Sequence, residues 1–284
     1  MKKQLIFATL ALLIASLACS IQNVQMKTIE TQEVSIAETL PDNLTDTELV
    51  FKMTGGEFSV HPGASGLVNG TIRYNIAQWE PEFTRSNHRY EIKQVNPFRI
   101  SGIPTGDTVN EWDLAISNAV PLDITIEGGA SKNLFNFSGL QISNLAITQG
   151  TSDTTIQFDV PNPISMEQFR FTTGASSADL FGLANANFEK MTMSAGAGDY
   201  TLDFSGTLNQ ETSVEIKAGI SNLTIIIPAQ MKAVVVNEGT VSSINTEGTW
   251  LLTDNTYNTL IESGPTLTIT LNMSVGNVKL IRQD

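Results

Sequence analysis

A short motif recurs along more than half of this chain, and its spacing constrains the fold more than any other feature. Two runs with alternating apolar residues flank a small turn that contains glycine, as in MTMSAGAGDYTLDF at residues 191–204. The turn glycines recur at a nearly constant interval: Gly129, Gly150, Gly174, Gly196, Gly219 and Gly239. A repeat of about 22 residues is typical of stacked, repetitive architectures.

The side chains at fixed distances from each glycine support this interpretation. Five residues before the glycines stand the apolar residues Ile124, Leu145, Phe169, Met191, Val214 and Val234, and three residues before them stand Ile126, Ile147, Phe171, Met193, Ile216 and Val236. Six residues after four of the glycines stand Ile156, Leu180, Leu202 and Ile225. Three residues after the glycines stand the polar residues Asp153, Ser177, Asp199, Asn222 and Ser242. Residues two apart on a strand share a face, so each set predicts one column, buried or exposed, in a stack of rungs.

We therefore predict an all-β fold, a single-chain β-solenoid made of rungs of about 22 residues. The alternative is an antiparallel sandwich of hairpins, which also has alternating residues and glycine turns. A sandwich gives no reason for the same chemistry to recur at the same offset through six units, so we favour the solenoid.

The same spacing extends the stack toward both ends of the chain. Phe51 and Met53 precede Gly56 in a first rung, and Leu271 and Met273 precede Gly276 in a last one. The final strand then carries Lys279 and Arg282, charges that discourage pairing at an exposed sheet edge.

The segment from Met1 to Cys19 resembles a bacterial lipoprotein signal peptide. Two lysines precede an apolar run, and Leu17, Ala18 and Cys19 resemble the lipobox, after which the cysteine is acylated. Cys19 is the only cysteine of the chain, so it has no partner for an internal disulfide. We predict lipidation at Cys19 and attachment to the outer face of the cell membrane; the alternative is a plain secretory signal peptide.

Residues 20–45 are rich in polar residues and predict a flexible tether. The chain has a net charge of −13, and removal of a leader with two lysines gives (16 − 2) − 29 = −15. Such an acidic chain is repelled by nucleic acids and by anionic headgroups. We expect a membrane contact through the lipid alone, and no nucleic-acid partner.

Residues 61–105 depart from the repeat and combine basic and aromatic side chains: Arg73, Arg85, Arg89, Lys93, Arg99, Tyr74, Trp79, Phe83 and Tyr90. They predict either a stacking platform for a sugar or aromatic ligand, or strands that bury the aromatic rings and expose the charges. We favour the second interpretation. The predicted organisation is a β domain at 46–110 followed by the repeat solenoid at 111–284.

Two segments resemble known families. The residues Gly55-Gly56-Glu57, Pro62-Gly63-Ala64 and Gly70 to Asn75 resemble the start of the bacterial toast-rack family. The later segments GAGDYTLDF and IKAGISNLTIIIP are similar to the C-terminal solenoid of LiaF-like envelope-stress proteins. The resemblance implies a surface solenoid, in some members associated with envelope-stress regulation, and it brings no catalytic residues.

The residue types needed for most catalytic sites are scarce. With His61, His88 and one cysteine, the sequence cannot supply a zinc site or a cysteine-histidine pair. A Ser-His-Asp triad is formally possible, but the chain has no GxSxG elbow. We therefore predict no catalytic, cofactor or metal residues.

Two pairs of carboxylates leave an alternative open. Asp199 and Asp203 share a strand face, as do Asp153 and Asp159, and stacked rungs could join them into a strip. Such a strip could bind Ca²⁺ or catalyse glycoside hydrolysis, but an ordinary solvated face explains it better.

The sequence thus predicts a surface-anchored, non-catalytic protein that binds an envelope protein or a glycan, or senses envelope stress. The alternatives are a polysaccharide-active enzyme that uses the strand-face carboxylates, and an adhesin or structural surface protein.

Overall fold

The computed structural model describes residues 25–41, 46–94 and 103–283, and nearly all of its regular structure is β. The strands are β1 (Gln25–Lys27), β2 (Gln32–Glu38), β3 (Thr47–Pro62), β4 (Val68–Tyr74), β5 (Pro81–Ser86), β6 (Arg89–Gln94), β7 (Ile103–Thr105), β8 (Asn110–Ile116), β9 (Leu122–Asn136), β10 (Ile142–Gln157), β11 (Met166–Phe181), β12 (Phe188–Asp203), β13 (Thr212–Pro228), β14 (Lys232–Asn237), β15 (Ser243–Glu247), β16 (Leu251–Thr253), β17 (Thr256–Asn258) and β18 (Thr266–Gln283). Two short 3₁₀ helices, η1 (Ala77–Trp79) and η2 (Leu183–Ala186), complete the list. The predicted all-β class is confirmed, and no helix within the described ranges has the length and apolarity to span a membrane.

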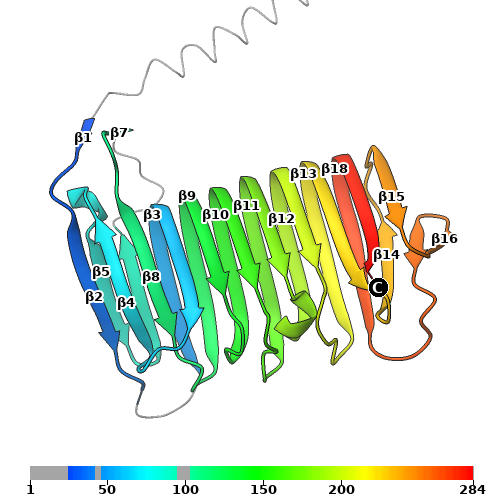
Figure 1. The fold of residues 1–284 in the computed structure, drawn as a ribbon, viewed down its shortest axis with the longest axis horizontal. Helices are drawn as coiled ribbons and strands as arrows, with labels where there is room; N and C mark the ends of the chain where they lie inside the picture. Colours follow the sequence, from blue (N-terminus) through cyan, green and yellow to red (C-terminus); the bar gives the residue numbers. More distant parts are fainter. Residues whose placement is uncertain (1–24, 42–45, 95–102, 284) are drawn as a thin grey trace, which may run out of the picture.

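The strands form an elongated stack, in which the long strands β9 to β13 follow one another side by side (Figure 1). Sixteen strands belong to one sheet, and β1 pairs with β7 in a separate sheet of two strands. The pairs from β9 to β13 are parallel and in register, so that Ile147 lies beside Phe171, Phe171 beside Met193 and Met193 beside Ile216. The predicted columns therefore exist, and the antiparallel sandwich is excluded for this part of the chain.

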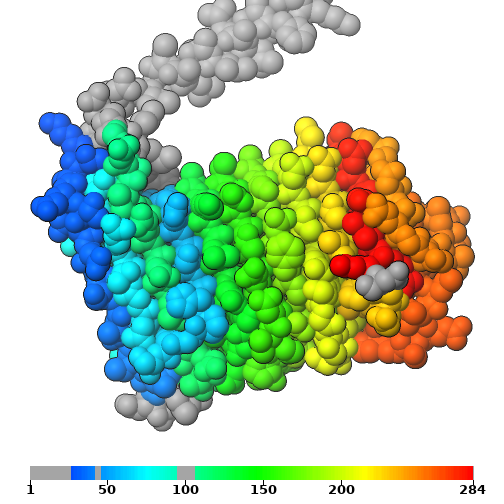
Figure 2. Space-filling model, viewed as in Figure 1, coloured from blue at the N-terminus to red at the C-terminus, as the bar shows by residue number. Residues whose placement is uncertain are grey.

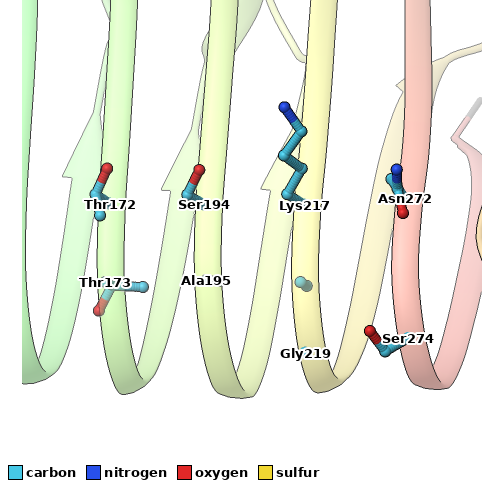
Figure 3. Close-up of a pocket in the computed structure, with 9 residues that line it drawn as sticks. Thr172, Thr173, Ser194, Ala195, Lys217, Gly219, Asn272 and Ser274 are labelled. Atoms are coloured by element: carbon cyan, nitrogen blue, oxygen red, sulfur yellow. The ribbon is translucent and has the colours of Figure 1, made fainter.

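The long strands β9 to β13 each turn a corner at a glycine and continue as a second arm, as at Gly219 of β13 (Figure 3). In β10, from Leu145 onward, the buried residues are Leu145, Ile147 and Gln149 before the corner and Ser152, Thr154 and Ile156 after it; Ile142, at the start of the strand, is also buried and precedes a register irregularity. The buried positions change from odd to even numbers because Gly150 and Thr151 lie together at the bend. We call the parts before and after the glycine the first and second arm, and their outer surfaces the first-arm and second-arm faces.

The inner sides of the two arms enclose the apolar core. Phe51 and Phe58, from the two arms of β3, pack edge to face with ring centroids 5.9 Å apart. Phe158 at the end of β10 contacts Phe169 of β11, with centroids 6.2 Å apart. Each fully buried column residue stabilises the fold by roughly 1.5–3 kcal/mol relative to exposure, so the columns supply most of the favourable burial.

At the N-terminal end, β3 connects the stack to the region around β4, β6 and β8. On one side β3 pairs with β9 along its length, and on the other its first half pairs with β6 and its second half with β8. Buried Gln94 fills the junction: its Oε1 accepts bonds from the Thr54 N–H (3.0 Å) and the Thr54 hydroxyl (2.8 Å), and its Nε2 donates to Asn110 Oδ1 (2.7 Å). The sheet continues across residue 110, and the predicted domain boundary there stays a prediction.

The C-terminal end departs from the sequential order. The last strand, β18, lies between β13 on one side and β14 and β15 on the other, so it fills the place that sequence order would give to β14. Figure 2 shows the red β18 residues between the yellow and orange ones. The prediction that the final strand is an exposed edge is therefore wrong.

Three column assignments near the ends were also wrong. In β14 the residues that face the core are Ala233 and Val235, while Val234 and Val236 are half-exposed. In β18 the columns are continued by Ile269 and Leu271, beside Val214 and Ile216, instead of Leu271 and Met273. In β3 they are continued by Leu49 and Phe51, beside Ile124 and Ile126, instead of Phe51 and Met53. Gly56 and Gly276 therefore do not occupy the corner position of the regular rungs.

Candidate binding groove

A shallow groove of about 490 Å³ lies at the corner of four adjacent strands, β11, β12, β13 and β18. We call it the corner groove, and its lining residues are Thr172, Thr173, Ser194, Ala195, Lys217, Ala218, Gly219, Asn272 and Ser274. Every strand that lines it is an interior strand with paired neighbours on both sides. The backbone under the groove is therefore held by the sheet on both sides.

One rim of the groove is a row of polar side chains. Thr172, Ser194, Lys217 and Asn272 are register partners on successive strands. In Figure 3 they stand at the same height on four neighbouring ribbons. Adjacent strands are about 4.8 Å apart, so the row presents one hydrogen-bonding side chain at each such step. The same column continues to Thr148 on β10 and Glu127 on β9.

Glycines occupy the corners of β11, β12 and β13 at the groove, whereas Ser274 occupies the corner of β18. A Cβ atom on Gly196 would lie 2.6 Å from the carbonyl oxygen of Gly174, and one on Gly219 would lie 2.6 Å from that of Gly196. These separations are too short for any side chain. The glycine repeat is thus explained by the close approach of successive rungs.

Two exposed apolar residues adjoin the groove lining on β13 and β18. Ile220 and Val275 directly follow the lining residues Gly219 and Ser274, and they are register partners on β13 and β18. Their side chains are 67% and 50% exposed, which is unusual for large apolar residues. The corner groove therefore combines a polar row with an adjoining apolar pair.

The charge inside the groove is nearly balanced. Lys217 Nζ lies 2.7 Å from Glu215 Oε1, in the neighbouring column of the same strand. This hydrogen bond, together with the charges of Lys217 and Lys190, lowers the pKa of Glu215. Beyond the row, Glu127 carries a carboxylate on one side, and Glu238 follows β14 on the other, where its N–H donates to Leu271 O.

The predicted carboxylates do not converge. Asp153 and Asp199 belong to one column of the second-arm face, but Ser177 lies between them, so their Cα atoms are roughly 9–10 Å apart. Asp203 accepts a bond from the Ser205 N–H (2.8 Å) instead. Among the described residues, no group of three acidic, histidine or cysteine side chains is placed to hold a metal ion.

Amide side chains connect the second-arm face instead. Asn222 Nδ2 donates to Asp199 Oδ1 (2.8 Å), and Asn277 Nδ2 donates to Asn222 Oδ1 (3.0 Å). The Ser243 hydroxyl donates to Asn277 Oδ1 (2.8 Å). This ladder crosses from β12 to β15 and satisfies the polar groups with one another.

In the aromatic and basic region at residues 61–105, tyrosine rings lie in the core and arginine side chains form ion pairs. Tyr74 and Tyr90 are buried, and burial is the main reason that the pKa of Tyr90 rises to about 12. Arg73 pairs with Glu111 at 2.5 Å, and Arg85 pairs with Glu38. These contacts agree with the second interpretation of this region, although Phe83 remains 44% exposed.

The histidines and the cysteine do not contribute to the groove. His61 lies near the end of β3, with its Nε2 3.4 Å from Asp113 Oδ1, and His88 lies in the turn between β5 and β6. Cys19, with the predicted signal peptide, lies outside the described residues.

The sequence contained a signal for part of the groove. Thr172, Ser194 and Lys217 each precede their corner glycine by two residues, so they form a further column at a fixed offset that the sequence prediction did not include. Asn272 had no such signal, because the corner of β18 is occupied by Ser274 and not by a glycine.

A protein-family model matches the part of the chain that contains most of the regular repeats. The model of the N-terminal domain of toast_rack, DUF2154, matches residues 22–167 and 159–226. The chain belongs to the toast-rack family. The predicted toast-rack membership is confirmed, whereas the LiaF-like resemblance of the C-terminal part stays a prediction.

The solved structures that match this toast-rack chain have low sequence identity to it and low TM-scores. A candidate cell adhesion protein from Clostridium sporogenes is 16% identical, with a TM-score of 0.45, and the match covers 89% of this chain and 99% of that one. A candidate adhesin from Bacteroides fragilis is 9% identical, with a TM-score of 0.38 and coverages of 91% and 100%. No curated protein matches the chain. At these scores the likenesses carry no conclusion about function.

Proposed function

We propose that this toast-rack protein is an exported, non-catalytic binding protein of the cell envelope, and that the corner groove is its contact surface. The observation that carries the proposal is the outward-facing row Thr172, Ser194, Lys217 and Asn272, which four paired strands hold in register. Binding to such a surface loses little conformational entropy, because the backbone is fixed before the ligand arrives.

The groove suits binding better than catalysis. The described residues that line it carry hydroxyl, amide and ammonium groups but no carboxylate, imidazole or thiol. General acid-base catalysis needs a group that gives or takes a proton near neutral pH, and Lys217 is held by Glu215 in an ion pair.

The proposal includes the predicted lipid anchor at Cys19. A lipid there would hold the chain at the outer face of the membrane. The predicted tether at residues 20–45 is too long, because Gln32–Glu38 form strand β2, which pairs with β4 in the main sheet, so only the residues before β2 are left to act as the spacer. A sensor of envelope stress would use the same contact surface, as the LiaF-like resemblance implies.

The binding function is tested by co-sedimentation of the full-length protein with purified cell-wall polymer. Ser194→Phe places a large ring in the middle of the groove, on an outward-facing position. Thr201→Phe is the matched control, because Thr201 lies on the same strand and faces outward on the second arm. We expect the wild type and Thr201→Phe to sediment with the polymer, and Ser194→Phe to stay in the supernatant. Equal sedimentation of all three would refute the groove as the contact surface.

The anchor is tested separately. The wild-type chain should fractionate with membranes, and Cys19→Ser should be released into the soluble exported fraction. Retention of Cys19→Ser in the membrane would contradict the lipid anchor without bearing on the groove.

A further inference from the structure

The direction and chemistry of the corner groove narrow the class of its ligand. The groove crosses its four strands, so a ligand in it runs along the stack and perpendicular to the strands. We infer that it takes a neutral, extended glycan with about one sugar unit above each strand. This inference rests on the proposed binding function and assigns its ligand class.

The spacing supports a polymer with a short repeat. The polar side chains recur at the strand separation of about 4.8 Å, which is close to the rise of one unit in an extended β-1,4-linked sugar chain. Sugar hydroxyls both donate and accept hydrogen bonds, as do Thr172, Ser194 and Asn272. Each unit of such a chain therefore meets the same kind of partner.

An extended peptide does not fit the groove in the same way. Peptides commonly bind sheets by adding a strand at an open edge, where backbone groups are free. The strands under the groove have neighbours on both sides, so their backbone groups are used within the sheet. A peptide across them would leave much of its own backbone without partners.

An anionic polymer is also disfavoured. The cation in the lining, Lys217, is paired with Glu215 at 2.7 Å. A polymer longer than the groove would meet Glu127 on β9, which pairs with Lys52 at 3.5 Å, or Glu238 beyond β14. The chain as a whole carries a net charge of −13, which adds a repulsive field.

The exposed apolar pair beside the groove supplies the second contact that sugars need. A sugar ring has a face of C–H groups, which packs against apolar side chains, while its hydroxyls point to the ring edge. Ile220 and Val275, which directly follow the lining residues Gly219 and Ser274, are 67% and 50% exposed. None of the described residues that line the groove is aromatic, so we expect weak binding per sugar unit and a strong dependence on chain length.

The test is calorimetric titration of the full-length protein with linear β-1,4-linked glucan and N-acetylglucosamine oligosaccharides, from disaccharide to hexasaccharide. The association constant should rise with length and level off at about four units, one for each lining strand. Ser194→Phe should weaken binding of the tetrasaccharide at least about tenfold, and Ile220→Asp should weaken it about threefold or more. Thr201→Phe, on the second-arm face outside the groove, should bind within about threefold of the wild type.

Three results would overturn the inference. These are affinity that does not depend on length, preference for polygalacturonate with loss of binding in Lys217→Gln, and loss of binding in Thr201→Phe. Failure here is distinguishable from failure of the proposed function. If cell-wall polymer still sediments the wild type but not Ser194→Phe, while no neutral oligosaccharide binds, the groove is a binding surface and only the ligand class is wrong.

Discussion

Strand pairing follows sequence order in the regular part of the stack, from β9 to β13, but not at its C-terminal end, from β14 to β18. In the regular part, each strand pairs with the strand that follows it in sequence, so register partners such as Met193 and Ile216 lie one repeat apart along the chain. At the end, β13 pairs with β18, and Ile216 and its partner Leu271 are separated by more than two repeats. The chain leaves the stack after β13, builds β14 to β17, and returns to fill the space left between.

This difference shows what a sequence period can and cannot predict. A constant spacing fixes the register when spatial neighbours are also sequence neighbours. Where a later strand inserts, the spacing still indicates strands, but it assigns them to the wrong column. The inserted β18 is itself paired along both arms, with β14 on the first and β15 on the second.

The largest expected effect comes from charging a column residue of the regular part. Ile216 is fully buried between Met193 and Leu271, so Ile216→Asp places a carboxylate in the apolar core. We expect a loss of more than about 4 kcal/mol and no soluble folded protein. Val236→Asp is the matched change at the C-terminal end, and it should cost less than about 1 kcal/mol because Val236 is half-exposed.

Thermal melts and soluble yield distinguish the two outcomes. The period alone assigned Ile216 and Val236 to one column and predicts equal damage. Similar melting temperatures for the two variants would mean that the insertion of β18 is wrong. The corresponding change at Leu202, buried in the second arm of β12, should be as severe as Ile216→Asp.

The sequence predicted the fold class and the central columns because their physical causes are local. Side-chain alternation defines the inner face, and Gly174, Gly196 and Gly219 recur because a Cβ would clash with the preceding rung. At the ends these causes are replaced by others. The register of β3 is set by three neighbouring strands, β6, β8 and β9. The pairing of β18 with β13 depends on the long connection 229–265, and no local sequence pattern encodes the path of that connection.

A smaller effect on stability is expected from substitutions at the corner residues of the two regions. Gly219→Ala places a Cβ 2.6 Å from the Gly196 carbonyl oxygen, so two rungs must move apart. We expect a cost of about 1–3 kcal/mol in the free energy of unfolding. Ser274 occupies the same corner position on β18 and already carries a Cβ, so Ser274→Ala should change stability by less than about 0.5 kcal/mol.

Denaturant unfolding measures both variants under the same conditions. If Gly219→Ala were as stable as the wild type, close approach would not explain the glycine repeat. The comparison also bears on the groove, because Gly219 and Ser274 both line it. The candidate site was harder to predict than the columns, since outward-facing positions such as Thr172 and Ser194 carry no burial signal, and only their register places them in one row.

The smallest expected effect concerns a column of the first-arm face that contains Asp123 near the N-terminal end of the stack and Thr268 near its C-terminal end. Asp123 lies beside Glu48 of β3 in the register, and partial burial, with Glu48 as the next cause, raises the pKa of its carboxyl group. A raised pKa in the folded state means that protonation favours folding. The favourable contribution is complete below the pKa of the unfolded chain, about 4, and is lost as pH rises through the higher folded value.

At neutral pH the wild type therefore carries a small penalty that Asp123→Asn should remove. We expect the variant to be more stable at pH 7 by less than about 1 kcal/mol, since the site is partly screened by solvent. At about pH 3 both proteins should have the same stability, because Asp123 is then protonated in both states. Thr268→Asn, near the C-terminal end of the same column, should have no such pH dependence, because Thr268 does not titrate. An equal gain for Asp123→Asn at both pH values would show that packing, and not the charge beside Glu48, sets its effect.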